Sequence, residues 1–420
     1  MIRRFARLVV LSLAVTACSL AITSAQPPSE PAPNVESMHP AHRALFFSVR
    51  RGTEWLMQAQ QPNGLFHQGL NVAVNTPLEN AHFYHQAEAA IALARVSRLT
   101  MNARYQTAAQ QATLTLLSST KIDPQDAQVR YTLFPETTVN RLASAGLLLR
   151  AVHELPAPAE VRLKEAEGLA QYIRTTQQTE GRFQSQASGV QQASSNTDQD
   201  AMNLLCQGFA VEGLALSQNY SPANWKSEAL QKAVRGYQQQ MPLVVVPDFI
   251  TGLADTYFRT KDANCAAAVF NMADALCNVQ QQAEPGKVAW VGGFMTTAVK
   301  TTALPPLTGE SARCVTALCD AYRVAKQAGD AARTEKYRNC ASMGVQFIIS
   351  LQYTGNGVEH FAESYQPRVL GAFRASVGEG VIRLQDTAEC VLAVSTYLSD
   401  ICGVSLAPAQ TTATVPAPVK

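Results

Sequence analysis

The chain of 420 residues lacks the features that mark several common classes of protein. Its formal net charge is only +2 and it has no run of Lys and Arg, which argues against a basic face for nucleic acid. Beyond the N-terminus, no apolar run approaches the roughly 18 residues that a membrane-spanning helix needs. Aromatic residues make up 7% of the chain, which argues against a pocket that guides carbocations. No complete catalytic signature is present, so the function must be inferred from several weaker signals.

The first 25 residues have the layout of a secretory signal, with three arginines, an apolar run from Leu8 to Val15 and then small residues. Two cleavage sites compete. Val15-Thr16-Ala17-Cys18 resembles a bacterial lipobox that would place a lipid on Cys18, whereas Thr23-Ser24-Ala25 suits an ordinary signal peptidase. We favour the lipobox because it follows the apolar run. The sequence thus predicts an extracytoplasmic protein, periplasmic or held at the outer membrane by a lipid anchor, and secreted if Cys18 is not lipidated.

The body of the chain is predicted to be one domain, residues 41–403, between two disordered segments. Residues 26–40 and 404–420 are rich in Pro together with Ser, Glu, Thr or Ala, as tethers are. With Cys18 processed, eight cysteines remain. Disulfides between neighbouring helices, such as Cys277 to Cys314 or Cys319 to Cys340, compete with the alternative that all are buried free thiols.

A short sequence phrase repeats along the chain. An aromatic residue is followed by Gln-Gln, Gly and Phe at fixed spacing in two copies, which are Trp55, Gln60, Gln61, Gly64, Phe66 and Tyr172, Gln177, Gln178, Gly181, Phe183. Weaker echoes follow Leu276, with Gln281, Gln282 and Gly286, and Phe347, with Gln352 and the turn Gly355-Asn356-Gly357. Such self-similarity indicates stacked helical units that bury their apolar faces against one another.

Apolar spacing predicts twelve helices, near 43–60, 80–99, 102–118, 137–154, 159–177, 199–218, 224–240, 248–260, 262–279, 310–327, 331–351 and 384–402. Amphipathic helices alternate with helices that are apolar almost all round, which predicts outer and inner helices. Most of the connections that enter the inner helices are long, and those that leave them are short. We therefore predict an all-α (α/α)6 toroid whose long loops gather on one face; the short connection before 248–260 leaves open whether the toroid closes fully.

The repeated phrase resembles the Gln-Trp repeats of the squalene cyclase and prenyltransferase superfamily, whose fold is an α/α toroid, although Phe66 and Phe183 replace the Trp. The same toroid carries glycoside hydrolases, polysaccharide lyases and uronyl epimerases. A further likeness lies in Asp198-Gln199-Asp200-Ala201, which matches three-quarters of the Asp-x-Asp-Asp acid motif of class II terpene cyclases. That resemblance would make Asp200 the proton donor. The alternative interpretation is that Asp198 or Asp200 only caps the N-terminus of a helix.

A dense polar group stands at the start of the second predicted helix and comprises Glu79, Asn80, His82, Tyr84 and His85. Two histidines three residues apart can bind a metal or move protons near neutral pH. No third ligand lies nearby in the sequence, so we expect no metal and no cofactor. Helix capping and structural hydrogen bonds are the alternative.

The loop from Tyr353 to Leu384 is the other candidate. It mixes aromatic residues with polar residues that suit carbohydrate recognition and proton transfer, and these are His360, Glu363, Arg368, Arg374, Arg383 and, just beyond, Asp386. The alternative is that the arginines only cap carbonyls or pair with carboxylates within the loop. Further polar residues fall at the mouths of other inner helices, among them Glu136, Asn140, Arg141, Asp248, Asp255, Glu310 and Arg313.

Together these signals predict a protein that binds, and cleaves or modifies, a carbohydrate or uronic-acid polymer in a funnel below the long loops. Glu79, His85, Asp200 and Asp386 are the acid and base candidates. The predicted binding residues are His82, Tyr84, His360, Glu363, Arg368, Arg374 and Arg383. Two alternatives remain open: a non-catalytic envelope lipoprotein that binds another protein, and a terpenoid cyclase-like enzyme.

Overall fold

The computed structural model describes residues 35–79, 82–135, 139–156, 158–185, 197–237, 241–296 and 304–404, with only the backbone at 197–201 and Ser37. By its internal contacts the chain divides into Met1–Pro31, outside the described residues, and Ala32–Lys420, to which everything below refers. In the described part, no helix combines the length and apolar character required to cross a membrane. Cys18 lies outside the described residues.

Two sets of helices alternate along the chain. The outer helices are α1 (Pro40–Ala59), α3 (Ala103–Ser118), α5 (Glu160–Thr175), α7 (Asn224–Gly236), α9 (Ala263–Asn278) and α11 (Ala331–Ser350). The inner helices are α2 (Phe83–Thr100), α4 (Arg141–Glu154), α6 (Thr197–Ser217), α8 (Val246–Thr260), α10 (Thr308–Ala328) and α14 (Leu384–Thr396), which continues as the π-helix η3 (Tyr397–Ile401). Counting η3 with α14, the predicted helix ends agree with these bounds to within four residues.

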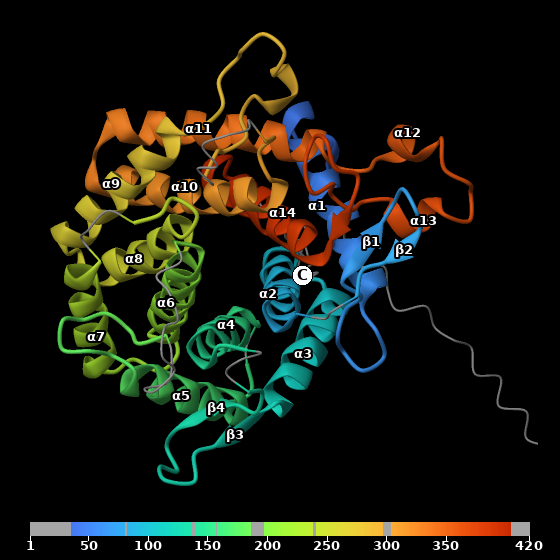
Figure 1. Cartoon of the computed structure of the whole chain (residues 1–420). Coiled ribbons are helices and arrows are strands. Elements are labelled where there is room, and N and C mark those ends of the chain that lie inside the picture. Colours follow the sequence, from blue (N-terminus) through green and yellow to red (C-terminus); the bar gives the residue numbers. More distant parts are fainter. Residues whose placement is uncertain are drawn as a thin grey trace, which may run out of the picture. The chain divides into compact units, whose positions relative to one another are not determined.

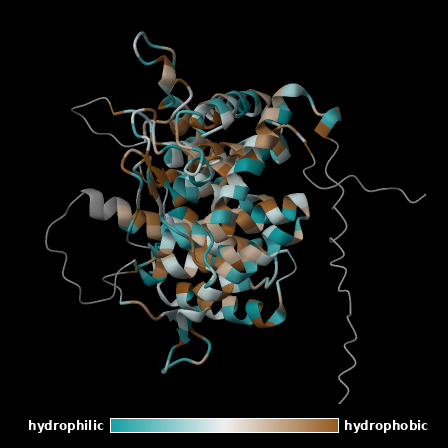
Figure 2. Ribbon diagram, turned by 90° about the vertical axis from the view of Figure 1, so that its right-hand side faces the viewer, coloured by the Kyte–Doolittle hydropathy of each residue, from teal (hydrophilic) through white to brown (hydrophobic). Residues whose placement is uncertain are grey.

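The inner helices form a closed ring. Each packs on the next in chain order, and α14 packs on α2 (Figure 1). The alternation of apolar and amphipathic segments follows from this arrangement: α4 is buried along almost its whole length, while α5 buries only one stripe. Teal and brown turns alternate along many helices in Figure 2, as expected of amphipathic helices. The prediction of an (α/α)6 toroid is confirmed.

The ring is tightest between α4 and α6. Gly146 of α4 faces the backbone of Phe209 on α6, where a Cβ atom would come within 2.2 Å of the carbonyl oxygen. A Cβ atom on Gly213 of α6 would similarly lie 2.4 Å from the carbonyl oxygen of Gly146. Only glycine permits two helix backbones to approach so closely.

The short helix η1 (Val35–Ser37) precedes α1, and the connections that enter the inner helices contain the other remaining elements of the described part. These are the short helices η2 (Val288–Trp290), α12 (Gly355–Val358) and α13 (Gln366–Val369), and the strands β1 (Gly69–Asn71), β2 (Thr76–Pro77), β3 (Thr120–Ile122), β4 (Arg130–Thr132) and β5 (Ile382–Arg383). The strands pair antiparallel in the order β2-β1-β5 and as the hairpin β3-β4. The connections that leave the inner helices are short, for example 261–262 and 329–330. The long loops therefore gather at the N-terminal ends of the inner helices, as predicted.

The repeated phrase is a structural joint that we call the glutamine bridge. A Gln just beyond an outer helix donates both amide hydrogens, one to a glycine carbonyl in its own turn and one to a carbonyl of another outer helix. For Gln60 the acceptors are Gly64 O (3.2 Å) and Ala108 O of α3 (2.9 Å). For Gln177 they are Gly181 O (3.0 Å) and Ala229 O of α7 (2.8 Å).

The two weaker echoes form the same bridge, but in a different register from the one the sequence suggested. Gln280, not Gln281, bonds Gly292 O (3.0 Å) and Cys340 O of α11 (2.8 Å). Gln352 bonds Gly371 O and Ser48 O of α1, both at 2.9 Å, and the Gly355 turn plays no part. Insertions between the Gln and its Gly moved the glycine away from the spacing of the first two copies, which hid it from the sequence comparison.

The glycine of each bridge is required by its backbone. Gly371 has φ of +94°, and a Cβ atom there would lie 2.3 Å from Arg51 O on α1. Two residues beyond each such glycine, a phenylalanine pairs with the bridging Gln in an isolated β-bridge, for example Gln352 with Phe373. The bridge therefore fixes the turn, the neighbouring outer helix and the entry to the next inner helix at once.

Gln352→Ala should lower the free energy of unfolding by about 2–4 kcal/mol, because it removes two buried hydrogen bonds. Gln346→Ala is the matched control, since Gln346 is exposed on α11, which ends just before Gln352. Equilibrium urea unfolding of both variants measures the difference. Equal stability of the two variants would show that the bridge contributes nothing to the fold.

Candidate functional site

Polar side chains form two layers at the N-terminal mouth of the ring, where the long loops gather. The first layer holds the third residue of four inner helices, which are His85 of α2, Asp248 of α8, Glu310 of α10 and Asp386 of α14. The second layer holds the sixth residue of three of them, which are Glu88, Arg313 and Glu389. At 1.5 Å rise per residue, the second layer lies about 4.5 Å deeper along the axis.

Asp386 is the acid of the first layer. Its side chain is buried, and Oδ2 accepts no hydrogen bond but lies 3.6 Å from Nη1 of Arg383. A Cβ atom on Gly309 would come within 2.4 Å of Asp386 Oδ1, so the glycine makes room for the carboxyl. Burial raises the pKa of Asp386 to about 7, against the lowering effect of Arg383. Near neutral pH this carboxyl is therefore partly protonated and able to donate a proton.

His85 lies beside the loop residue Gln68, whose Oε1 is 3.2 Å from Nδ1 of the ring. Burial, followed by the neighbouring His82 and Arg383, lowers the pKa of His85 to about 4, so the ring is neutral at pH 7. Nε2 of Gln68 is buried and has no partner. A neutral imidazole next to an unused amide donor can bind hydroxyl groups.

Asp248, the second layer and the ion pair below it together contain more acid than base. Arg313 pairs with Asp248, and Nη1 of Arg150 lies 2.9 Å from Oε2 of Glu212, one turn further into the ring. Glu88 and Glu389 add two more buried carboxyls, which raise each other's cost of ionisation. Four carboxyls thus face two guanidinium groups. Ionising all four buried carboxyls would be unfavourable, so some of them keep their protons.

Burial is the main cause of the raised pKa values of these carboxyls. Burial and then the charge of Glu389 raise the pKa of Glu88, and burial raises the pKa of Glu389 against Arg313 and Arg150. Burial also raises the pKa of Glu212 to about 8. Oε1 of Glu88 accepts a long hydrogen bond from Gln385 (3.5 Å), and its Oε2 has no donor. Glu88 and Glu389 therefore form a coupled pair able to hold or release a proton below Asp386.

Some of the predicted site residues are brought together and others are not. His82, Tyr84, His85, Arg383 and Asp386 lie at the mouth. His82 caps α2 through Nδ1, and Tyr84 Oη accepts a hydrogen bond from the backbone of Asn140 (3.0 Å). Glu79 is exposed at the end of its loop. The side chain of Asp200, together with Asn80 and Glu136, lies outside the described residues.

Four predicted binding residues belong to the loop around α12 and α13, which lies beside β1 and β2 at the periphery in Figure 1. His360 packs on Phe361, with ring centroids 3.9 Å apart, and Glu363 lines a groove against α1. Arg368 donates to Asn75 Oδ1 (2.6 Å), and Arg374 contacts Ser350 O (3.4 Å). These contacts match the alternative in which the loop arginines have a structural role.

Sequence reasoning missed Glu88, Glu389, Arg150 and Glu212. A signal was present, because each is a charged residue inside or beside a helix that is otherwise apolar all round. Such a residue is buried on any face and must be paired or neutralised. Among the residues that the structure describes, no three His, Cys, Asp or Glu side chains are grouped to hold a metal ion.

The opposite, C-terminal end of the ring is closed by mutually paired charges. A cavity of about 520 Å³ there is lined from all six inner helices. Glu154 binds Arg95 and Arg98, each at 2.5 Å, and Arg323 lies 3.3 Å from Asp320 and 3.7 Å from Asp400 of η3. Arg150 and Glu212 also line this cavity, and burial raises the pKa of Asp320 to about 6 and raises that of Asp255.

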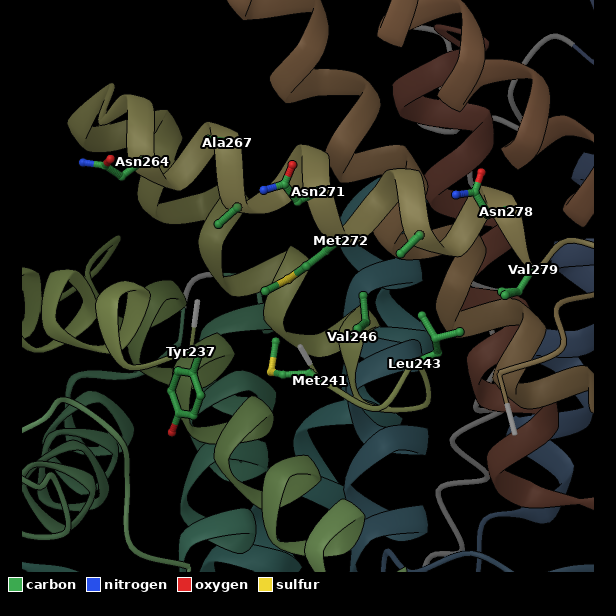
Figure 3. Close-up of a pocket in the computed structure, with 12 residues that line it drawn as sticks. Tyr237, Met241, Leu243, Val246, Asn264, Ala267, Asn271, Met272, Asn278 and Val279 are labelled. Carbon is green, nitrogen blue, oxygen red and sulfur yellow. The ribbon is translucent and has the colours of Figure 1, made fainter. Parts of the chain in front are cut away.

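An apolar groove of about 710 Å³ runs along the outside, between α9 and the segment from Tyr237 to Val246 (Figure 3). Met241 and Met272 point toward one another across it, and Asn264, Asn271 and Asn278 follow one side of α9. The groove lies at the short connection into α8, where the sequence left open whether the toroid closes. It opens on the outer surface, between outer helices.

The comparisons with known proteins support the fold. No family model and no curated protein matches the sequence. Among solved structures, an unsaturated glucuronyl hydrolase specific for heparin has a TM-score of 0.61 at 15% identity, over 87% of this chain and 99% of the other. A cellobiose 2-epimerase from Bacillus thermoamylovorans B4167 has a TM-score of 0.60 at 10% identity, over 85% of this chain and 99% of the other. The GH76A α-1,6-mannanase from Salegentibacter sp. HEL1_6 has a TM-score of 0.59 at 9% identity, over 84% of this chain and 98% of the other. The chain thus shares the α/α-toroid fold of glycosidases and epimerases.

Replacing Asp386 by Asn should stabilise the protein at pH 8 by up to roughly 4 kcal/mol and have no such effect at pH 4. Because the folded-state pKa is raised, the unfolded chain loses its proton first as pH rises from about 4 to about 7. The wild type therefore loses stability across that window, and the Asn variant does not.

Unfolding free energies of both proteins between pH 4 and pH 8 measure this effect. Glu335→Gln is the control. Arg338 lowers the pKa of the exposed Glu335 carboxyl, so removing that charge should not stabilise the protein at pH 8. A constant difference between wild type and Asp386→Asn at all pH values would contradict the raised pKa.

Proposed function

We propose that the protein is a carbohydrate-active enzyme, a glycoside hydrolase or an epimerase, that acts at the N-terminal mouth of the ring. The observation that carries this proposal is the pair of layers in which buried carboxyls with raised pKa values converge below long loops. Hydrolysis and epimerisation of sugars both require a group that donates a proton and another that accepts one. The toroid neighbours include enzymes of both kinds.

The layers suggest a division of roles. Asp386, whose pKa is about 7, is the proton donor at the mouth. The coupled pair Glu88 and Glu389 supplies the second carboxyl, because one member can ionise while the other stays protonated. His85 and Gln68 orient hydroxyl groups, and Arg383 binds an acidic substituent such as a uronic carboxylate. A neighbour of the same fold, an inactive mannanase variant, has been solved in complex with α-1,6-mannotriose, which supports an oligosaccharide ligand.

Asp386→Asn should lower kcat by about 100-fold or more on the oligosaccharide that the enzyme turns over, because the proton donor is lost. The variant should still bind that sugar, which would stabilise it by about 2.7 kcal/mol at 100 times its Kd. Thermal-shift and reducing-end assays against neutral and uronic oligosaccharides provide both readouts.

Glu363→Gln is the matched control, since this exposed carboxyl lies on the peripheral loop and should leave kcat and binding unchanged. Equal loss of activity in both variants would place the chemistry elsewhere. Absence of binding and turnover across the panel, with every protein folded, would reject the carbohydrate proposal.

The second candidate function is a protein-binding scaffold in the cell envelope, and the apolar groove beside α9 favours it. Methionines adapt to varied partners, and an exposed apolar groove of this kind is a common binding surface. The third candidate, a terpenoid cyclase-like enzyme, rests on the Gln-Trp-type phrase and on Asp200. The charged second layer favours a polar ligand over a hydrocarbon chain.

We also propose that the protein is exported and anchored by a lipid on Cys18, as the order of arginines, apolar run and lipobox suggests. Cys18→Ala should abolish incorporation of a labelled fatty acid and release the protein from the membrane fraction. A wild type that takes up no label and stays outside the membrane fraction would favour cleavage after Ala25, which removes Cys18.

A further inference from the structure

Two thiols meet between the outer helices α9 and α11. Cys277 is the last residue but one of α9, and Cys340 lies in the middle of α11; their side chains hydrogen-bond each other. Cys277 is buried and Cys340 is half-buried. Cys206 and Cys402 instead hydrogen-bond the hydroxyl groups of Tyr84 and Tyr397. The pair Cys277 and Cys340 was not among the pairs suggested by the sequence.

The surrounding contacts hold the two backbones together at this point. The glutamine bridge of Gln280 ends on the carbonyl of Cys340 itself, at 2.8 Å. Asp274 of α9 binds Lys336 at 2.8 Å and Arg333 at 3.2 Å, both on α11. Tyr337 Oη donates to Phe270 O at 3.2 Å. These contacts flank the thiols and hold α9 against α11 at the place where a disulfide would form.

The charges near the pair distinguish the two sulfurs. The hydrogen bond from Cys277 lowers the pKa of Cys340, and Lys336 lowers it further, against burial and Asp274. The same hydrogen bond and burial raise the pKa of Cys277. Cys340 is thus the partly exposed thiol with thiolate character, and Cys277 is the protonated neighbour. A low-pKa thiol poised next to a resolving thiol is the arrangement of a reactive dithiol.

We propose that Cys277 and Cys340 are a redox-active dithiol that closes to a disulfide between α9 and α11, with small organic disulfides as the oxidant. The thiolate of Cys340 attacks one sulfur of the oxidant and expels the other as a thiolate. Cys277 then gives its proton to solvent and attacks the mixed disulfide at Cys340, which expels the second thiolate. Two protein thiols are oxidised, and one disulfide is reduced to two thiols.

The bond would couple distant parts of the chain, since the two cysteines are separated by 63 positions (340 minus 277). It would also hold the wall of the apolar groove, because Asn278 and Val279 follow Cys277 directly and line that groove. Oxidation should therefore stiffen α9 while leaving the two layers at the mouth unchanged.

The test uses the full chain, purified reduced and then equilibrated in glutathione buffers of increasing oxidising strength. Alkylation followed by peptide mapping should show Cys277 joined to Cys340, with a rise of several degrees in Tm that dithiothreitol reverses. A folded wild type in which both thiols remain alkylatable in oxidised glutathione overturns the proposal. So does a disulfide that joins either cysteine to another partner.

Single variants identify the order of attack. Cys277→Ser should trap glutathione on Cys340 as a stable mixed disulfide, whereas Cys340→Ser should leave the buried Cys277 unmodified. Lys336→Gln should slow alkylation of Cys340 several-fold at pH 7, and Cys402→Ser, the control, should close the bond as the wild type does. Glutathione trapped on Cys277 in place of Cys340, or an unchanged rate in Lys336→Gln, would refute the assigned roles.

Discussion

The fold depends on one repeated hydrogen-bonding unit, a buried glutamine amide that ties its own turn to another outer helix. Four of these units join α1 to α3, α5 to α7, α9 to α11 and α11 back to α1. The β3-β4 hairpin packs on α5 between the first two pairs. In the described residues no such unit joins α3 to α5 or α7 to α9, and the apolar groove lies at the second of these places. The groove thus occurs where neither the unit nor the hairpin joins neighbouring outer helices.

Burial of charge is the second constraint, and it separates the two ends of the ring. At the C-terminal end two arginines bind Glu154 and lower its pKa to about 2, whereas burial raises the pKa of Asp320 to about 6. At the N-terminal mouth carboxyls outnumber guanidinium groups, and burial raises the pKa values of Glu88, Glu389 and Asp386. A fold selected for stability alone would avoid this excess. The unfavourable ionisation at the mouth is the physical reason to place the chemistry there.

The sequence predicted the helices and their inner and outer positions, because hydrophobic periodicity reports directly which faces are buried. It also predicted the mouth and, within it, His85 and Asp386. It placed the weaker repeats in the wrong register, since insertions of variable length separate Gln280 from Gly292 and Gln352 from Gly371. It missed Glu88 and Glu389, whose importance depends on partners in other helices. Pairing across a ring is a long-range property that local spacing does not contain.

The last helix of the chain has a consequence for biosynthesis. The bridge from Gln352 to Ser48 spans 304 positions, and α14 closes the ring by packing on both α1 and α2. The ring can therefore close only after translation has passed residue 396. Arg383, Asp386 and Glu389 are made in that same final stretch, so closure and completion of the candidate site coincide. A chain released early by the ribosome would have neither a sealed core nor an acid group at its mouth, and it would be exposed to proteolysis before it could act.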